Sequence, residues 1–449
     1  MIRFAIPLFV GVAVAFTSLI PARAQNADVR ANVSNLVDKA YPELFDLYKH
    51  FHANPELSFK EEKTATRLAG ELSRAGYIVT TKVGGQGVVA VLKNGDGPTL
   101  LIRTDLDALP VKEQTGLPYA SQARGPGDEG KDVDVMHACG HDVHMTCLVG
   151  TARVLAQLKD RWHGTLVFIG QPAEERGGGA RAMLAEGLFT KFPKPNQCLA
   201  LHVGSDLPAG MVGIVEGYAL ANVDSVDITV RGVGGHGAWP HTTKDPIVLA
   251  AQIVVALQTI VSREIQPGEP AVVTVGSIKG GEKHNIIPEE VKLQLTLRSY
   301  TDEVRQQTIA SVKRIANGLA QAAGVPADRM PVIKIKDEFT PALYNDPALT
   351  RRTKAAFEKW LSPANVITRK PVMGGEDFSE YGRTTDKIPV SMFWLGAASP
   401  EVLKETLKAG KIPPSLHSSF FRPEPEPTIK TGITAMTAAA LELLGKPAK

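Results

Sequence analysis

Four clusters of side chains that can bind a metal ion or move a proton stand out along the chain: Asp105 and Asp107, Cys139 with His141 and His144, Glu174 with Glu175, and His202. Thiolate sulfur, imidazole nitrogen and carboxylate oxygen are the ligands that transition metals use in hydrolytic enzymes. In an adjacent acidic pair, one carboxylate can bind the metal while its neighbour takes a proton from a water on that metal. These residue types therefore indicate metal-dependent hydrolysis.

Each cluster by itself also has a structural explanation. Cys139 and His141 could form a tight turn with a buried histidine, Glu174 and Glu175 a solvated loop, and Asp105 a helix cap. The metal site is favoured because most of these clusters come just after a predicted strand. Ligands of open α/β sheets bind beyond the carboxyl ends of the strands, so the topology should bring such clusters together.

The strands that position these clusters are short, β-rich and separated by amphipathic helices. Strands are predicted at residues 88–92, 99–104, 166–170 and 198–203, and helices at 34–52, 60–74, 142–158 and 179–187. Strands that alternate with helices are typical of an α/β sheet covered by helices on both faces. The expected fold is therefore α/β, a metallopeptidase-like mixed sheet flanked by helices.

From residue 221 to residue 337 the pattern differs. Strands predicted at 226–231, 272–278, 291–299 and 332–336 combine with helices at 246–263 and 302–323 in the order βαββαβ. This order is that of a ferredoxin-like unit. The first pattern returns afterwards, with a helix at 346–360, a strand at 390–395 and a helix at 428–444. We therefore predict a catalytic domain of residues 25–220 and 338–449, with an inserted lid or dimerisation domain at 221–337.

The first 24 residues have the pattern of a secretory signal peptide. Arg3 supplies a positive start, residues 4–20 are an uncharged apolar stretch, and Ala22-Arg23-Ala24 forms an A-x-A cleavage pattern. A membrane anchor is the alternative, but the apolar stretch is short and a cleavage pattern follows it. We expect an exported protein, periplasmic or secreted, without a membrane attachment after cleavage.

Composition excludes several other classes of protein. The chain has 449 residues, of which 43% are hydrophobic and 22% are charged, as in ordinary globular proteins. A net charge of +3 without a basic run does not suggest a nucleic-acid partner. The three cysteines do not suggest a disulfide framework in so long a chain. Cys147 and Cys198 are predicted to be buried apolar residues, with a disulfide between them left open.

Eight short runs are spread over almost the whole mature chain. They are RTDLDALP at 103–110, MHACGHD at 136–142, QPAEE at 171–175, GGHGAWPH at 234–241, NIIP at 285–288, LRS at 297–299, GEDF at 375–378 and LHSS at 416–419. In this order they resemble peptidase family M20, and within it the amidohydrolase branch of aminoacylases, hippurate hydrolases and plant auxin-conjugate hydrolases.

This resemblance implies a site for two divalent metal ions per subunit, Zn or Mn, with Ni or Co as alternatives. By motif, the residues that resemble the metal ligands are Cys139, His141, Glu175, His202 and His417. Glu174 resembles the general base, and Asp107 a supporting carboxylate of the catalytic site. His236, Asn285 and Arg298 resemble lid residues that meet the substrate, His236 often in the active site of a partner subunit. A homodimer through the lid domain is therefore expected.

The activity that the resemblance implies is hydrolysis of the amide bond of N-acyl amino acids or related amino-acid conjugates. A dipeptidase or carboxypeptidase of the same family is the main alternative, because it also cleaves an amide beside a free carboxylate. A periplasmic binding protein would share export and a two-lobed shape, but it would not need Glu174 and Glu175 beside a thiol and imidazoles. A serine hydrolase and a P-loop enzyme are disfavoured, because the chain contains neither G-x-S-x-G nor G-x-x-x-x-G-K-[ST].

Overall fold

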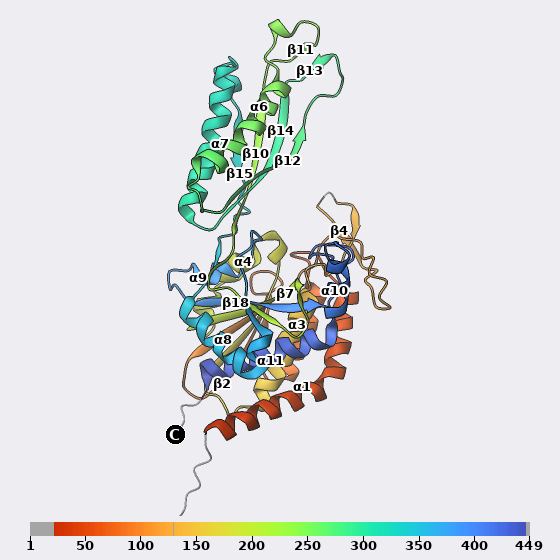
Figure 1. Cartoon of the computed structure of the whole chain (residues 1–449), viewed down its shortest axis with the longest axis vertical. Helices are drawn as coiled ribbons and strands as arrows, with labels where there is room; N and C mark the ends of the chain where they lie inside the picture. The colour runs from red at the N-terminus through yellow and green to blue at the C-terminus, as the bar shows by residue number, and fades with distance from the viewer. Residues whose placement is uncertain (1–21, 129, 446–449) are drawn as a thin grey trace, which may run out of the picture.

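The computed structural model describes residues 22–128 and 130–445 and divides them between two sheets of different kinds. An eight-stranded sheet lies in the larger unit and a four-stranded sheet in the smaller one, which stands at one end of the long axis of the molecule (Figure 1). The predicted signal peptide, residues 1–24, lies outside the described residues except for 22–24, which belong to the first helix.

The large sheet has the strand order β1-β2-β6-β3-β7-β18-β8-β17. Its strands are β1 (Ile78–Thr81), β2 (Val88–Asn94), β3 (Thr99–Asp105), β6 (Gly164–Gln171), β7 (Gln197–Pro208), β8 (Val212–Ile214), β17 (Val366–Thr368) and β18 (Val390–Ala398). The central strands β6, β3, β7 and β18 run parallel. The pairs β1–β2, β2–β6 and β18–β8 are antiparallel, and the edge strand β17 is parallel to β8. The sheet is mixed, as the sequence predicts.

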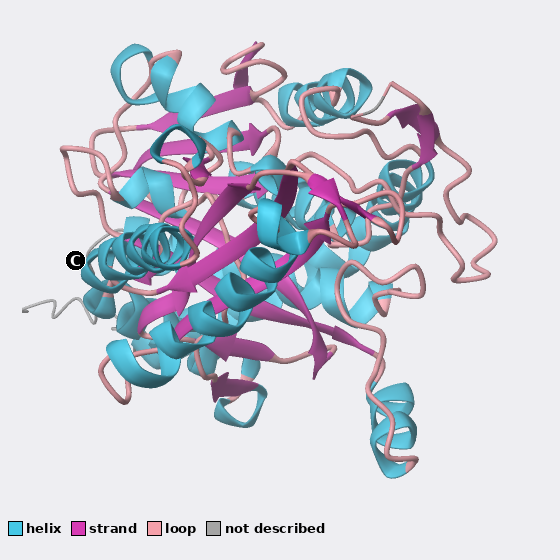
Figure 2. Cartoon of the chain, turned by 90° about the horizontal axis from the view of Figure 1, so that it is seen from above, coloured by secondary structure: helices cyan, strands magenta, loops and turns pink. Residues whose placement is uncertain are grey.

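Helices cover both faces of this sheet (Figure 2). One face packs against α1 (Ala22–Ala53), α2 (Glu62–Arg74), α3 (His141–Gln157), α8 (Pro347–Leu361) and α11 (Pro425–Leu444). The other face packs against α4 (Gly179–Ala185), α5 (Leu188–Lys191) and α9 (Ser379–Gly382). Because both faces are covered, β6 is buried at every residue, and its sequence is almost continuously apolar.

The smaller unit has the strand order β12-β14-β10-β15 and is antiparallel throughout. Its elements are β10 (Asn222–Arg231), α6 (Pro246–Thr259), a π-helical turn (Ile260–Glu264), β12 (Ala271–Lys279), β14 (Glu290–Ser299), α7 (Asp302–Ala322) and β15 (Val332–Ile335), with β11 (Gly235–His236) and β13 (Ile286–Ile287) as a separate ribbon. Alternate residues of β10 are buried, because only one face of this sheet is covered by helices.

Several short elements were not predicted from the sequence. They are β8 and β17 at one edge of the large sheet, the paired strands β9 (Gly217–Leu220) and β16 (Leu343–Asn345), the hairpin β4 (Arg124–Pro126) with β5 (Asp132–Asp134), and α10 (Pro400–Lys408). Helix α1 also begins at Ala22 rather than near residue 34. Strands of three or four residues are too short to show a period in the sequence.

Among the described residues, one helical stretch, Pro246–Glu264, has the length and apolar composition of a membrane span. It corresponds to α6 and the π-helical turn of the smaller unit. Leu249, Ile253 and Leu257 lie on its buried side and pack into the core of that unit. The stretch is therefore a packed helix with one apolar side left exposed.

Candidate metal centre

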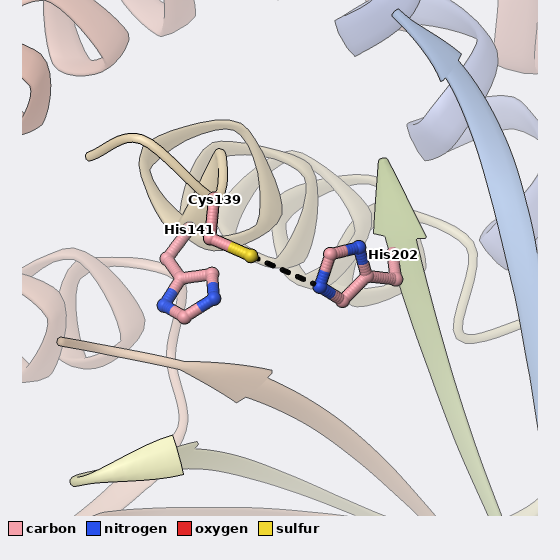
Figure 3. Close-up of side chains that lie close together, drawn as sticks. All are labelled: Cys139, His141 and His202. Carbon is pink, nitrogen blue, oxygen red and sulfur yellow. Dashed lines mark hydrogen bonds between the residues drawn. The ribbon is translucent and has the colours of Figure 1, made fainter. Parts of the chain in front are cut away.

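The predicted metal ligands converge at the carboxyl ends of the central parallel strands. Cys139 and His141 flank the N-terminus of α3, and His202 lies on β7 (Figure 3). The Cys139 sulfur is 3.5 Å from Nε2 of His202 and 3.3 Å from Nε2 of His417. Nε2 of His417 is in turn 3.5 Å from Oε1 of Glu175. The structure therefore brings together all five residues that the sequence proposes as ligands.

Gly140 allows Cys139 and His141 to point into the same space. Its φ angle is +78°, a conformation that favours glycine, and it caps the N-terminus of α3. A Cβ atom at this position would lie 2.5 Å from Cγ2 of Val203. The order Cys-Gly-His is therefore a steric requirement of the close approach between α3 and β7.

Backbone carbonyls decide which ring nitrogen of each histidine faces the centre. Nδ1 of His141 donates to the carbonyl of Asp107 at 2.7 Å, and Nδ1 of His202 donates to the carbonyl of Val203 at 2.9 Å. A carbonyl can only accept, so each Nδ1 carries hydrogen, and Nε2 is the nitrogen that offers a lone pair when the ring is neutral. This is the tautomer that a metal-binding histidine needs.

Two of these atoms are buried and have no hydrogen-bond partner within the described part of the chain, namely Nε2 of His141 and Oε1 of Glu175. Buried polar atoms without partners are rare in folded proteins and need a reason. Groups of atoms within 4.8 Å of one another include Cys139 with His141 and His202, and Cys139 with Glu175 and His417. Sulfur, nitrogen and oxygen donors in two triads that share Cys139 fit divalent cations such as zinc.

The acidic pair lies on a short 3-10 turn, Glu174–Arg176, that begins after a strained residue. Ala173 has a φ angle of +49°, which is unusual for a residue with a Cβ atom. The carboxylate of Asp107 accepts from the amides of Glu174 at 3.2 Å and Glu175 at 3.0 Å, and from Oγ of Ser58 at 2.6 Å. Asp107, predicted to be a supporting carboxylate, therefore holds the acidic pair in place by binding the backbone amides of Glu174 and Glu175.

The acidic pair also depends on Glu61, which the sequence analysis did not single out. Its side chain is fully buried, and Oε1 accepts from the amides of Phe59 at 2.9 Å and Ala173 at 2.8 Å. Burial, and next the negative charge of Asp107, raises the pKa of Glu61 from 4.5 to about 7. No sequence signal marks this residue, because it lies more than a hundred positions from the turn that it stabilises.

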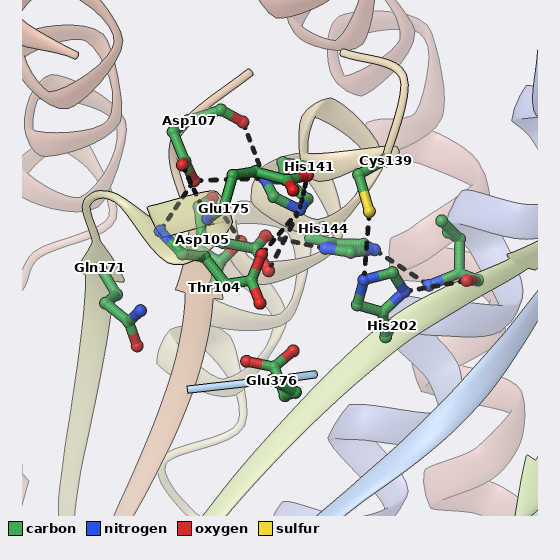
Figure 4. A network of polar contacts seen from close by, with 12 residues as sticks. Thr104, Asp105, Asp107, Cys139, His141, His144, Gln171, Glu175, His202 and Glu376 are labelled. Atoms are coloured by element: carbon green, nitrogen blue, oxygen red, sulfur yellow. Dashed lines mark hydrogen bonds and ion pairs between the residues drawn. The ribbon is translucent and has the colours of Figure 1, made fainter. Parts of the chain in front are cut away.

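A buried arginine forms the floor of the site. The guanidinium of Arg103 lies 2.7 Å from Asp105, 2.8 Å from Glu376 and 3.2 Å from Asp377, and it is fully buried with them. Figure 4 shows Glu376 below the cluster of proposed ligands, and Asp105 beside Glu175 and His144. All four residues stand in the runs at 103–110 and 375–378, but the sequence alone did not indicate that they pair.

Negative charge dominates the surroundings of the acidic pair. Burial, then the charges of Glu376 and Glu175, raises the pKa of Glu174 well above its ordinary value, although Arg103 opposes the shift. Burial also raises the pKa of the Cys139 thiol, as do Glu175 and Glu174. Divalent cations among these groups would reverse both effects by stabilising thiolate and carboxylate.

A cavity of about 520 Å³ opens over the cluster. Its lining includes Glu174, Arg298, Glu376, Trp394 and His417. Arg298 is half-buried and donates through Nη1 to the carbonyl of Met373 at 3.0 Å. Of the three predicted substrate-binding residues, Arg298 is therefore the one that reaches the cavity in the same chain.

The other two predicted substrate-binding residues, His236 and Asn285, lie elsewhere. Both are exposed and line a hollow on the β11–β13 ribbon, at the end of the smaller unit remote from the large sheet (Figure 1). Nδ1 of His236 accepts from the amide of Ala238 at 3.0 Å, so its Nε2 carries hydrogen and faces outward. In this conformation of a single chain, neither residue joins the metal cluster.

The remaining cysteines do not take part in the cluster. All three cysteines of the chain are described, and each is a buried free thiol. The disulfide between Cys147 and Cys198 that the sequence left open is therefore not formed. Burial raises the pKa of both thiols above its ordinary value, in agreement with the predicted role as buried apolar residues.

Residues 101–442 match the sequence family described as peptidase family M20/M25/M40. The chain belongs to this family. The predicted resemblance is confirmed, and so is the assignment of this M20 chain as a hydrolase that depends on metal. Its α/β fold with a mixed sheet flanked by helices is that of solved M20 structures.

Relatives of this M20 chain include enzymes named for different amide substrates. The hippurate hydrolase of Campylobacter jejuni is 38% identical over 350 residues, which are 75% of this chain and 86% of the relative. Thermostable carboxypeptidase 2 of Saccharolobus solfataricus is 33% identical over 423 residues, 93% of this chain and 100% of the relative. A structure of a dinuclear metal-binding M20 peptidase from Bacillus subtilis has a TM-score of 0.72 and 29% identity, covering 91% of this chain and 99% of its own.

Replacing Cys139 by Ala should abolish stable binding of metal, because both triads of donor atoms share this sulfur. We expect elemental analysis of the dialysed Cys139→Ala protein to show little or no retained metal, because a sulfur shared by both triads is lost. Cys147→Ala is the matched control, since Cys147 is a buried thiol of α3 outside the cluster. Full metal content in Cys139→Ala would contradict the proposed cluster.

Glu61→Gln should make the protein more resistant to unfolding at high pH. The pKa of Glu61 is about 7 in the folded protein and 4.5 in the unfolded chain. The protonated carboxyl of Glu61 therefore contributes fully to the free energy of unfolding below pH 4.5, and this contribution is lost as the pH rises through 7. Glutamine keeps the acceptor oxygen and carries no charge. The melting temperature of Glu61→Gln relative to the native protein should therefore rise between pH 5 and 8, and a constant difference would show that Glu61 is ionised throughout.

Proposed function

We propose that this protein hydrolyses the amide bond of N-acyl amino acids or related amino-acid conjugates, with Glu174 as the general base. The observation that carries the proposal is the position of Glu174 beside the group of potential metal ligands, in the same cavity as Arg298. The cavity thus offers a base next to a cationic centre and a guanidinium for the carboxylate of an amino acid.

The proposed ligands are Cys139, His141, Glu175, His202 and His417. Two divalent cations bound there, zinc or manganese, would lower the pKa of a water towards neutrality and polarise the amide carbonyl. The tautomers of His141 and His202 and the free oxygen of Glu175 support this assignment.

Glu174 moves the proton in this mechanism. Its Oε2 lies 3.9 Å from Nε2 of His141, so a water held at the centre is within its reach. Glu174 takes a proton from the attacking water and returns it to the nitrogen of the departing amine. With cations bound beside it, Glu174 would be a carboxylate, the form that can accept this proton.

The cavity also suggests how the substrate is oriented. Arg298 binds the free carboxylate of the amino-acid part, while the apolar wall of Leu220, Val372 and Trp394 receives an apolar group. A carboxypeptidase is the second candidate, since thermostable carboxypeptidase 2 is a relative over 93% of this chain. It would use the same guanidinium, because a peptide also ends in a free carboxylate.

A homodimer would bring the remaining lid residues to a cavity. His236 and Asn285 are exposed at the far end of the smaller unit, so a partner chain would have to supply them. The apolar side chains of Val248 and Val255 are exposed by 54% and 72% on α6, and β12 is an edge strand. Such a surface fits a second copy of the same unit. Nε2 of His236 would then donate to the oxyanion of the substrate.

Export is the third part of the proposal. The arginine, the apolar stretch and the A-x-A pattern of the first 24 residues support cleavage by a signal peptidase. The protein would act in the periplasm or outside the cell, without nucleic-acid or membrane partners.

The experiment that tests the function is a screen of N-acetyl, N-benzoyl and dipeptide substrates on metal-loaded protein, read by release of the amine. We expect N-acyl amino acids to be cleaved faster than dipeptides. Glu174→Gln should retain metal but lose about 10²–10⁴-fold in kcat. Turnover of Glu174→Gln within a few-fold of the native protein would remove Glu174 as the base, and faster cleavage of dipeptides would favour the peptidase.

Mixing two inactive variants tests whether His236 acts in a partner chain. His236→Ala lacks the lid donor and Glu174→Gln lacks the base, so each homodimer should be nearly inactive. In a mixed dimer one composite site keeps both residues, and random exchange should restore about a quarter of native activity. A mixture of the His236→Ala and Cys139→Ala proteins should recover activity in the same way. If no mixture recovers although light scattering shows dimers, His236 does not act in the partner.

A further inference from the structure

His144 is a buried imidazole within the metal cluster that the proposed mechanism does not use. Its side chain is 2% exposed, and its ring lies 5.3 Å from the ring of His141 and 4.7 Å from that of His202. It also forms a potential metal-binding group with Asp105 and His141. By residue type and position, His144 could therefore be another ligand.

Both nitrogens of His144 are already occupied by other groups. The backbone amide of Val203 donates to Nε2 at 2.9 Å, so Nε2 must carry the lone pair. Nδ1 then carries the hydrogen, and it donates to Oδ1 of Asp105 at 2.8 Å. A cation could not bind Nε2 without breaking the bond to Val203, and it could not bind Nδ1 without removing a proton. His144 therefore does not have a free lone pair.

The position of His144 explains why an imidazole is needed there. Strands β3 and β7 pair from Leu100 with Gln197 to Arg103 with Ala200, and their pairing ends at that point. Figure 4 shows His144 between Asp105, at the end of β3, and His202 on β7. The ring thus bridges the carboxyl ends of the two strands between which the metal cluster lies.

Through Val203 this bridge reaches a proposed metal ligand. His144 holds the amide of Val203, and the carbonyl of the same residue accepts from Nδ1 of His202. At the other end, Asp105 accepts from Arg103 at 2.7 Å, and Arg103 in turn contacts Glu376 in the cavity wall. A change at His144 would therefore displace His202 on one side and loosen the floor of the site on the other.

We propose that His144 is a positioning residue that fixes His202 for metal binding through Val203 and Asp105, and that it is not itself a ligand. The inference rests on the metal site of the proposed function. It adds a residue whose loss weakens metal binding although all five proposed ligand residues are still present in the chain.

Metal affinity of the full-length protein tests this role. His144→Phe keeps a ring of similar size and removes both nitrogens, and it should lower zinc affinity about 10–100-fold. His144→Gln keeps an acceptor and a donor and should recover part of that loss. His163→Gln is the control, because His163 directly precedes the first residue of β6, whereas the metal cluster lies at the other end of that strand. Competition with a zinc chelator gives the affinities, and thermal unfolding of the metal-free proteins shows whether each variant folds.

The native protein supplies a second measurement that does not depend on folding of a variant. With ¹⁵N-labelled histidine, His144 should show the Nδ1–H neutral tautomer both before and after zinc is added. The Nε2 signals of His141 and His202 should change on zinc addition. A zinc-induced change of Nε2 of His144, or native zinc affinity in a folded His144→Phe, would overturn the inference. Failure of the native protein to bind zinc or manganese would instead refute the proposed function.

Discussion

The buried charge of the site is the constraint on which the rest of the structure depends. Three carboxyl groups, those of Asp105, Glu376 and Asp377, contact the buried guanidinium of Arg103. Three more, those of Asp107, Glu174 and Glu175, lie within 4 Å of the His141 ring. Burying so much negative charge is unfavourable unless protons or cations balance it. Raised pKa values of about 7 for Glu175 and Asp377 are the result when protons do so. Divalent cations would replace those protons, and Nε2 of His141 and of His202 already face the space where they would lie.

Hydrogen bonds between side chains and backbone groups give the cluster its geometry. Carbonyl oxygens bind Nδ1 of His141 and of His202. The carboxylate of Asp107 holds the turn of the acidic pair by accepting from the backbone amides of Glu174 and Glu175. Two residues near the centre have unfavourable positive φ angles, Ala173 at 49° and His417 at 67°. Such strain persists only where the surroundings hold the backbone. For His417 that restraint includes the bond from its amide to the carbonyl of Ala138 at 2.8 Å.

The two units of the chain divide the site between them. The large sheet carries the proposed ligands and the base, and the smaller unit contributes Arg298 from β14 to the same cavity. His236 and Asn285 lie on a ribbon at the other end of that unit. If His236 and Asn285 act on the substrate as proposed, another chain or a large movement must bring the ribbon to the cavity. Catalysis would then depend on assembly as well as on metal.

The sequence by itself determined the order of the main elements and the residue types of the centre. Strands β3, β6 and β7 were predicted to within a few residues, because long apolar runs bounded by turn residues report burial directly. The exception is the end of β7, which continues to Pro208. Cys139, His141 and Glu175 were expected to be ligands because the runs that contain them resemble those of family M20. Only the tertiary structure decided that Arg103 pairs with Glu376, that Glu61 supports the acidic pair, and that His236 lies away from the cluster. These relations join positions far apart in the chain, and a local pattern holds no information about which distant groups burial will bring into contact.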